Sequence, residues 1–350
     1  MYRKLLKILE DKDAFLITSP HELRYFTGFS GGEGMAVIGK DFRILITDSR
    51  YIEAAAKEAE EFETIEASLY YMQLNGILSD RGIRRIFYND SHMTVKELSR
   101  INSALKGAFE LIPAADSLEK MRLIKTEYEL ECIRTAEAIG SAAFDYVLGK
   151  IRENMTELEL AAEIEYFMKK SGAQKTSFDT IAVSGKKTSM PHGVPDDKKI
   201  SLGDFITMDF GCVYKGYCSD MTRTVVLGKA DKKQKEIYNI VLNAQLAALE
   251  FMEAGRSAKA ADRVARDIIE EAGYGKFFGH SLGHGVGLLI HELPNLSPKS
   301  DCILEENMVV SCEPGIYLPG FGGVRIEDLV VIKHGGIENL TSADKKFTEI

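Results

Sequence analysis

The apolar residues in the first third of the chain fall into short runs that are separated by polar or turn-forming stretches. Apolar and β-branched runs bounded by such punctuation are typical of buried strands. We predict strands at residues 14–17, 35–38, 43–47 and 85–88. Helical or turn-like stretches lie between them, which favours a small α/β domain over residues 1–120.

The pattern changes near Met121, where apolar residues recur at helical spacing and predict a long amphipathic helix from Arg122. We place a second domain at 121–350. Two segments within it, 156–172 and 257–273, each begin with a hydroxyl-bearing cap residue and end at glycine, about one hundred residues apart. This internal similarity predicts two related halves that share an axis.

The stretch around Asp209 and Asp220 predicts a β-hairpin, because aromatic and β-branched residues flank a glycine-containing turn. A hairpin with one aspartate on each strand would hold two carboxylates side by side. Two like charges at that distance are unfavourable unless a proton or a cation compensates them. The hairpin therefore indicates a cation site.

A second acidic pair, Glu313 and Glu327, repeats this arrangement, and His284 lies between the two pairs with glycines on either side. One imidazole and four carboxylates suit manganese, iron(II), cobalt or zinc better than an ion that prefers thiolates. Four carboxylates are more than one ion needs, whereas two neighbouring ions share bridging carboxylates and a water. The residues thus predict a dinuclear hydrolytic centre.

In their order and contexts, these residues resemble the ligand set of the pita-bread metallopeptidases, which include Xaa-Pro aminopeptidase, prolidase and methionine aminopeptidase. The motifs are Asp-Phe-Gly, Ser-Asp-x-Thr-Arg, Gly-His-Gly-x-Gly, Glu-Pro-Gly and Arg-Ile-Glu. The resemblance implies an α/β (α+β) fold, with a pita-bread catalytic domain of pseudo-twofold symmetry after a smaller α/β domain. Methionine aminopeptidases generally lack such a domain, so its presence favours the proline-directed branch.

The resemblance also implies a role for each ligand. Asp209 would chelate the first metal, His284 and Glu313 the second, and Asp220 and Glu327 would bridge both. Glu313 would also act as general base or proton shuttle. Two divalent ions per subunit are expected, with manganese or cobalt as the first choice and zinc or iron as alternatives.

Three further histidines, His192, His280 and His291, occupy positions that resemble the family's substrate-facing histidines. They would hydrogen-bond the substrate carbonyl and the tetrahedral oxyanion. Arg325, two residues before Glu327, would orient a carboxylate with its donor fork. The remaining histidines have no motif around them and are expected to be structural; they are His21, His92 and His334.

Composition excludes several other classes of function. The net charge of −9 and the absence of a Lys/Arg-rich run argue against nucleic acid as a partner. The glycine-rich loop at 26–32 lacks the lysine and hydroxyl of a Walker motif. No signal-peptide core and no membrane-length apolar stretch is present, and the five cysteines have no disulfide-framework pattern. We expect a cytoplasmic protein whose cysteines are packing residues.

These observations predict a metallo-exopeptidase that hydrolyses the bond between an N-terminal residue and a following proline. An Xaa-Pro aminopeptidase-like enzyme is favoured over an Xaa-Pro dipeptidase (prolidase), and the residues do not decide between them. A metal-free creatinase-like hydrolase and a non-enzymatic pita-bread binding protein are the more distant alternatives. The resemblance also implies a homodimer.

Overall fold

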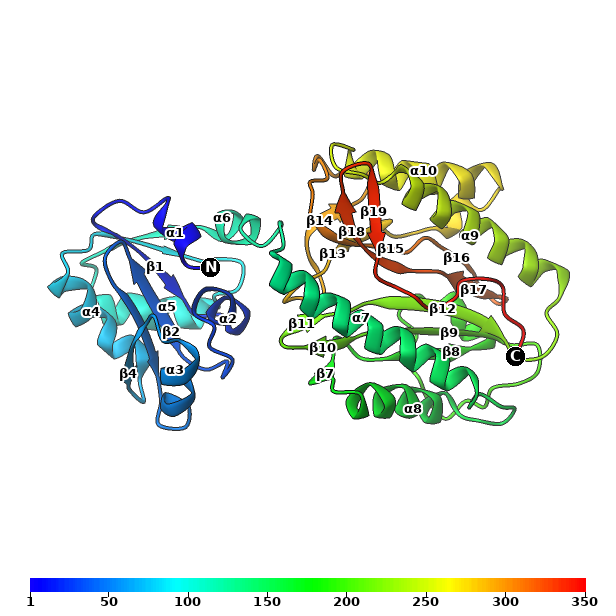
Figure 1. The fold of residues 1–350 in the computed structure, drawn as a ribbon, viewed down its shortest axis with the longest axis horizontal. Helices are drawn as coiled ribbons and strands as arrows, with labels where there is room; N and C mark the ends of the chain where they lie inside the picture. Colours follow the sequence, from blue (N-terminus) through cyan, green and yellow to red (C-terminus); the bar gives the residue numbers. More distant parts are fainter. The chain divides into compact units, whose positions relative to one another are not determined.

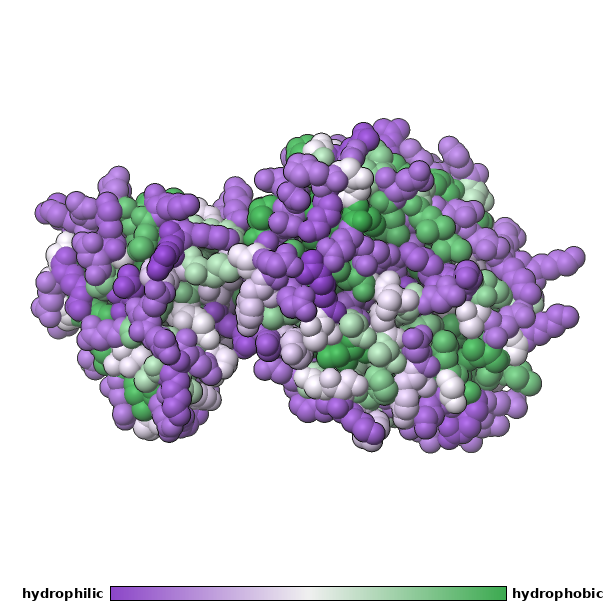
Figure 2. Space-filling model, viewed as in Figure 1, coloured by the Kyte–Doolittle hydropathy of each residue, from purple (hydrophilic) through white to green (hydrophobic).

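The computed structural model describes residues 1–350, which form two compact units, Met1–Met121 and Arg122–Ile350 (Figure 1). Hydrophilic side chains cover most of the face that Figure 2 shows on each unit, with apolar residues scattered between them. No helix has both the length and the apolar character that a membrane span requires.

The first unit is built on one mixed sheet with the strand order β4-β3-β2-β1-β5-β6. Strands β1 to β3 are antiparallel neighbours, whereas β4, β5 and β6 join in parallel. The strands are β1 (Asp13–Ile17), β2 (Met35–Gly39), β3 (Arg43–Thr47), β4 (Glu63–Glu66), β5 (Arg85–Tyr88) and β6 (Glu110–Pro113). The helices are α1 (Arg3–Leu6), α2 (Pro20–Thr27), α3 (Ile52–Glu58), α4 (Tyr70–Asp80), α5 (Val95–Leu105) and α6 (Ala115–Lys120).

The four strands predicted in this unit are present as β1, β2, β3 and β5. Strands β4 and β6 were not predicted, and they are the two edges of the sheet. Each places a glutamate at its first residue and has no fully buried position. Their composition therefore lacks the apolar run that marks a central strand.

The second unit contains two helix pairs, α7 with α8 and α9 with α10, and each precedes a group of strands (Figure 1). The helices are α7 (Glu127–Leu148), α8 (Glu157–Lys170), α9 (Lys232–Phe251) and α10 (Ala258–Glu271), with the 3₁₀ turns η1 (Gly185–Ser189) and η2 (Gly275–Phe277). The first group of strands is β7 (Lys175–Thr176), β8 (Ile181–Ser184), β9 (Phe205–Phe210), β10 (Cys212–Tyr214), β11 (Tyr217–Cys218) and β12 (Met221–Val226). The second is β13 (Gly283–Gly285), β14 (Glu292–Leu296), β15 (Val309–Cys312), β16 (Gly315–Leu318), β17 (Gly322–Arg325), β18 (Asp328–Lys333) and β19 (Gly336–Asn339).

The repeated helix signals are present as α8 and α10. The hydroxyl of Thr156 accepts a hydrogen bond from the backbone of Glu159, and that of Ser257 accepts one from Ala260. Each helix pair covers its own core: one apolar cluster joins α7 and α8 to β8 and β9, and another joins α9 and α10 to β15 and β18. The order of elements therefore repeats once along this unit.

The long helix predicted from Arg122 begins later, at Glu127, so its predicted start was wrong. Thr126 has extended backbone angles and forms a capping box with Glu129, which fixes the first helical turn. The preceding residues, Arg122 and Lys125, direct their side chains to a buried carboxylate instead. Tertiary ion pairing thus outweighed the local periodicity.

Candidate metal centre and active site

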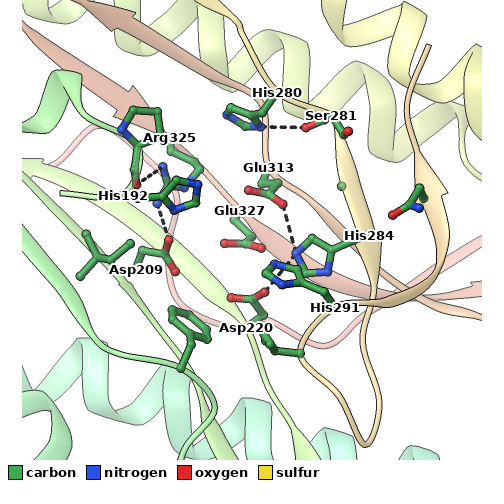
Figure 3. A pocket seen from close by; sticks show the side chains of 16 residues that line it. His192, Asp209, Asp220, His280, Ser281, His284, His291, Glu313, Arg325 and Glu327 are labelled. Atoms are coloured by element: carbon green, nitrogen blue, oxygen red, sulfur yellow. Dashed lines mark hydrogen bonds and ion pairs between the residues drawn. The ribbon is translucent and has the colours of Figure 1, made fainter. Parts of the chain in front are cut away.

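Every residue predicted to act in the site lines one cavity of about 320 Å³ in the second unit. In Figure 3, Glu313 and Glu327 lie in the middle, Asp209 and Arg325 on one side, and His284 and His291 on the other. The remaining lining is largely apolar or small, and includes Phe178, Ile181, Pro191, Ser281, Gly283, Ile290 and Asn295.

Strand pairing brings the acidic residues together from both halves. Asp209 lies in β9 opposite Thr222 of β12, and Thr222 also forms an isolated β-bridge with Glu327. Asp220 directly precedes β12, and Glu313 directly follows β15. The first acidic pair thus meets the second at Thr222, where the two halves adjoin.

His284 of β13 presents one ring nitrogen to the carboxylates. Its Nδ1 lies 3.2 Å from the carbonyl oxygen of Gly285. Its Nε2 lies 3.5 Å from Asp220 Oδ2 and 3.3 Å from Glu313 Oε1. When Nδ1 donates its proton to the carbonyl, Nε2 is the atom available for a metal, and such a second bond fixes the tautomer and orientation of a ligating histidine.

Burial and mutual repulsion disfavour the charged forms of several of these carboxylates. Burial first, and then the charges of neighbouring carboxylates, raise the pKa values of Asp220 and Glu327 well above the ordinary range. Burial also raises the pKa of Asp209, although Arg325 opposes it. For Glu313 burial acts in the same direction, but the hydrogen bond and charge of His284 outweigh it and lower the pKa to about 2.

The cavity fits divalent cations by its donor chemistry. Buried Asp209 Oδ1 and Glu327 Oε1 have no hydrogen-bond partner, although buried polar atoms normally have one. Ligand atoms of Asp220, His284 and Glu327 lie within 4.8 Å of one another. Oxygen atoms without partners, close carboxylates and an oriented imidazole are what a hard or borderline divalent ion requires.

We expect Glu327→Gln to stabilise the metal-free protein at neutral pH by roughly 1–2 kcal/mol while lowering its activity. A carboxyl whose pKa is raised in the folded state contributes stability at acid pH that is lost as the pH rises toward that raised pKa. The neutral amide avoids this loss. Thermal unfolding of both proteins after chelation and dialysis measures the effect, and an unchanged or lower Tm for the variant would contradict it.

Arg325 links the acidic cluster to the cavity wall. Its Nη2 pairs with Asp209 Oδ2, its Nε donates to Thr222 Oγ1 at 3.0 Å, and its Nη1 donates to Tyr317 Oη at 2.8 Å. The side chain is 4% exposed. All three nitrogens of the guanidinium are therefore engaged, and the carboxylate that Arg325 contacts is that of Asp209, which the sequence did not single out for it.

The three additional histidines differ in their freedom to bind a substrate. The ring of His291 lies 4.3 Å from that of His284, centre to centre, and burial lowers the pKa of His291, which favours the neutral imidazole. His192 lines the cavity. Both ring nitrogens of His280 are engaged, with Ser281 O at 2.8 Å and Tyr317 Oη at 2.9 Å. His280 therefore joins Tyr317 and Arg325 in one chain, and the catalytic roles of the three histidines stay predictions.

A buried carboxylate behind the centre had no sequence signal. Glu137 of α7 is fully buried, accepts the backbone N–H of Asp220 at 3.2 Å and accepts the Thr341 hydroxyl at 2.6 Å. Burial raises its pKa to about 7. Glu137 thus fixes the backbone at a predicted metal ligand.

A buried ion-pair group lies beside His291. Lys125 Nζ is 2.8 Å from Glu292 Oε1, and Arg122 Nε is 3.6 Å from Glu292 Oε2. The side chain of Lys125 is 1% exposed, that of Arg122 is 5% exposed and that of Glu292 is 3% exposed. A Cβ on Gly287 would lie 2.4 Å from Glu292 Oε1, so a larger residue there would push this carboxylate from its present position. The group fixes the segment that carries His291.

The remaining histidines and the cysteines near the predicted ligands behave as packing or surface groups. Cys212, Cys218 and Cys312 are buried free thiols, and burial raises the pKa of each. None of them lines the cavity. His334 is 80% exposed and pairs with Glu306, while the rings of His21 and His92 contact each other in the first unit.

Comparison with known proteins places both units in characterised families. Residues 131–334 match the model of metallopeptidase family M24, and residues 2–124 match that of the creatinase/prolidase N-terminal domain. The chain is 39% identical over 355 residues to Xaa-Pro dipeptidase of Pyrococcus furiosus, covering 98% of each protein.

Two solved structures superpose on this chain over its whole length. An Xaa-Pro dipeptidase from Bacillus anthracis superposes with a TM-score of 0.96 at 42% identity, covering 100% of this chain and 99% of the other. An X-Pro aminopeptidase from Thermotoga maritima superposes with a TM-score of 0.93 at 41% identity, with the same coverage of both chains. The predicted fold, a pita-bread catalytic domain after a smaller α/β domain, is therefore confirmed.

Proposed function

The chain belongs to metallopeptidase family M24, and from that premise we propose that it is a metal-dependent exopeptidase which hydrolyses the bond between an N-terminal residue and a following proline. The observation that carries the proposal is the convergence of four carboxylates and one imidazole on a single cavity, with two buried carboxylate oxygens lacking a partner. The names of the relatives support the preference for proline.

The predicted ligands are Asp209, Asp220, His284, Glu313 and Glu327. We propose that they hold two divalent ions, with manganese or cobalt favoured, because four carboxylates exceed the needs of one. Ions bound there would supply Lewis-acid activation of water and of the scissile carbonyl.

The protein's own groups have separate tasks in this proposal. Glu313, whose Oε1 lies 3.3 Å from His284 Nε2 in the cavity, accepts a proton from the attacking water. His291 and His192, at the cavity wall, donate hydrogen bonds to the substrate carbonyl and to the oxyanion that forms from it. Arg325 and Tyr317 hold Asp209 in place.

We favour an Xaa-Pro aminopeptidase-like activity over a strict dipeptidase. Arg325 is the one lysine or arginine that lines the metal cavity, and all three of its guanidinium nitrogens are already engaged. A dipeptidase needs a cationic group that binds the C-terminal carboxylate of the proline itself. The dipeptidase names of several relatives favour the alternative, prolidase.

Cleavage of matched Xaa-Pro and Xaa-Pro-Xaa peptides by the metal-reloaded protein tests the proposal. We expect both to be hydrolysed, with the tripeptide at least as good a substrate, and the matching Xaa-Ala peptides to be poor ones. Hydrolysis of the dipeptide alone would assign prolidase. Failure to cleave any Xaa-Pro peptide with manganese, cobalt, zinc or iron would overturn the proposed function.

The cellular setting is also a proposal. Five free cysteines without a disulfide support a reducing, cytoplasmic location. A homodimer is proposed from the family resemblance, and light scattering of the purified protein measures it directly. A monomer at micromolar concentration would contradict that part.

A further inference from the structure

A second cavity, of about 590 Å³, adjoins the metal cavity. Pro191, His192 and His280 line both, so the two cavities are neighbours that share these side chains. The rest of its lining comes from the segment around η2 and from the end of β16: Lys276, Phe277, Gly279, Tyr317 and Pro319. A peptide that extends past the metal cavity at His192 would enter this second cavity.

The lining of the second cavity is mostly apolar with a single ammonium group. Phe277, Pro319 and Tyr317 supply apolar surface, and Lys276 is the one lysine or arginine present. The Nζ of Lys276 lies 4.9 Å from the centre of the Phe277 ring. The apolar wall can contact an apolar side chain, and the cation beside it can pair with a free C-terminal carboxylate. The cavity therefore suits an apolar residue at the C-terminus of a peptide.

The metal cavity offers no such partner. Its guanidinium, on Arg325, is bound to Asp209, Thr222 and Tyr317, and its other charged side chains are the predicted metal ligands and histidines. Across the two cavities, Lys276 is therefore the one lysine or arginine for which no carboxylate partner is seen.

We propose that this cavity is the binding site for the residue after proline, and that Lys276 pairs with the C-terminal carboxylate of an Xaa-Pro-Xaa tripeptide whose third residue is apolar. The inference rests on the proposed function and narrows its substrate class. Lys276 is exposed and near the surface, so its contribution is that of a partly solvated ion pair.

The test compares kcat/KM for three substrates: an Xaa-Pro-Phe tripeptide acid, the same tripeptide as its C-terminal amide, and the Xaa-Pro dipeptide. The acid and the amide differ only in the charge that Lys276 is proposed to bind. For the unmodified enzyme we expect the acid to be favoured over the amide by roughly two- to fivefold at low salt. High salt should reduce this preference.

Variants assign the preference to one side chain. Lys276→Met should bring the acid-to-amide ratio close to one, Lys276→Glu should invert it, and Lys276→Arg should retain it. Cleavage of the dipeptide should stay within twofold throughout. Lys259→Met, on the exposed face of α10 and outside both cavities, is the matched control and should keep the preference.

The outcomes separate this inference from the proposed function. An acid-to-amide ratio that is the same in Lys276→Met and in the unmodified enzyme overturns the role of Lys276, whatever the absolute rates. Refusal of both tripeptides together with cleavage of the dipeptide overturns the second cavity as a substrate site but retains an Xaa-Pro peptidase. Failure of the unmodified enzyme to cleave any Xaa-Pro peptide overturns both proposals.

Discussion

Replacing His284 by alanine is expected to lower kcat/KM by at least about 100-fold while the protein stays folded. Mutation of a residue that only orients a metal ligand typically costs about 10–100-fold, and His284 is itself a predicted ligand. Its Nε2 lies between Asp220 and Glu313, so its removal also leaves these carboxylates without their nearest compensating group. Glu313→Ala should have an effect of similar size.

Activity and metal content must be measured together on each variant. We expect one divalent ion fewer per chain in His284→Ala, by elemental analysis after dialysis, and unchanged circular dichroism. His334→Ala is the control, because His334 is 80% exposed and lies outside the cavity. Near-normal turnover in either His284→Ala or Glu313→Ala would contradict the dinuclear centre.

Replacing Lys125 by methionine is expected to destabilise the protein by about 3–5 kcal/mol, the usual cost of removing one partner of a buried ion pair. Glu292 would keep the more distant Arg122 at 3.6 Å and the backbone N–H of Leu289 at 3.4 Å, in a site where its side chain is 3% exposed. A carboxylate left in such surroundings bears most of its desolvation penalty. The change should also lower kcat, because Glu292 directly follows His291.

Urea unfolding of Lys125→Met, Glu292→Gln and the double variant measures this cost. The double variant should lose less stability than the sum of the two single variants, because both single changes remove the same Lys125–Glu292 contact. Exposed Lys259→Met is the control and should change the free energy of unfolding by less than about 0.5 kcal/mol. A similarly small effect of Lys125→Met would show that the pair is unimportant for stability.

Local signals in the sequence were sufficient for many elements of the fold. Thr156, with Glu159 three positions later, marked the start of α8. Short apolar runs marked the central strands of the first unit. The start of α7 was missed because the side chains of Arg122 and Lys125 pair with Glu292, more than 160 residues later. Periodicity along the chain contains no information on such a partner.

For the site, too, local motifs were informative and contacts between distant residues were not. The motifs around Asp209, Asp220, His284, Glu313 and Glu327 identified residues that the fold then places around one cavity. Tyr317 and Glu137 had no local signal, because each matters through its contacts with residues elsewhere in the chain. Tyr317, for example, is defined by its bonds to His280 and Arg325. Sequence alone therefore indicated the chemistry of the ligands and, Arg325 apart, not the groups that orient them.

Titrating the metal-stripped protein with manganese or cobalt, while following cleavage of an Xaa-Pro-Xaa peptide and counting bound ions, tests the dinuclear peptidase centre. We expect no cleavage without metal, and full activity only as the second ion binds to each chain. Full activity with the metal removed, or with no divalent ion bound at saturation, would contradict it.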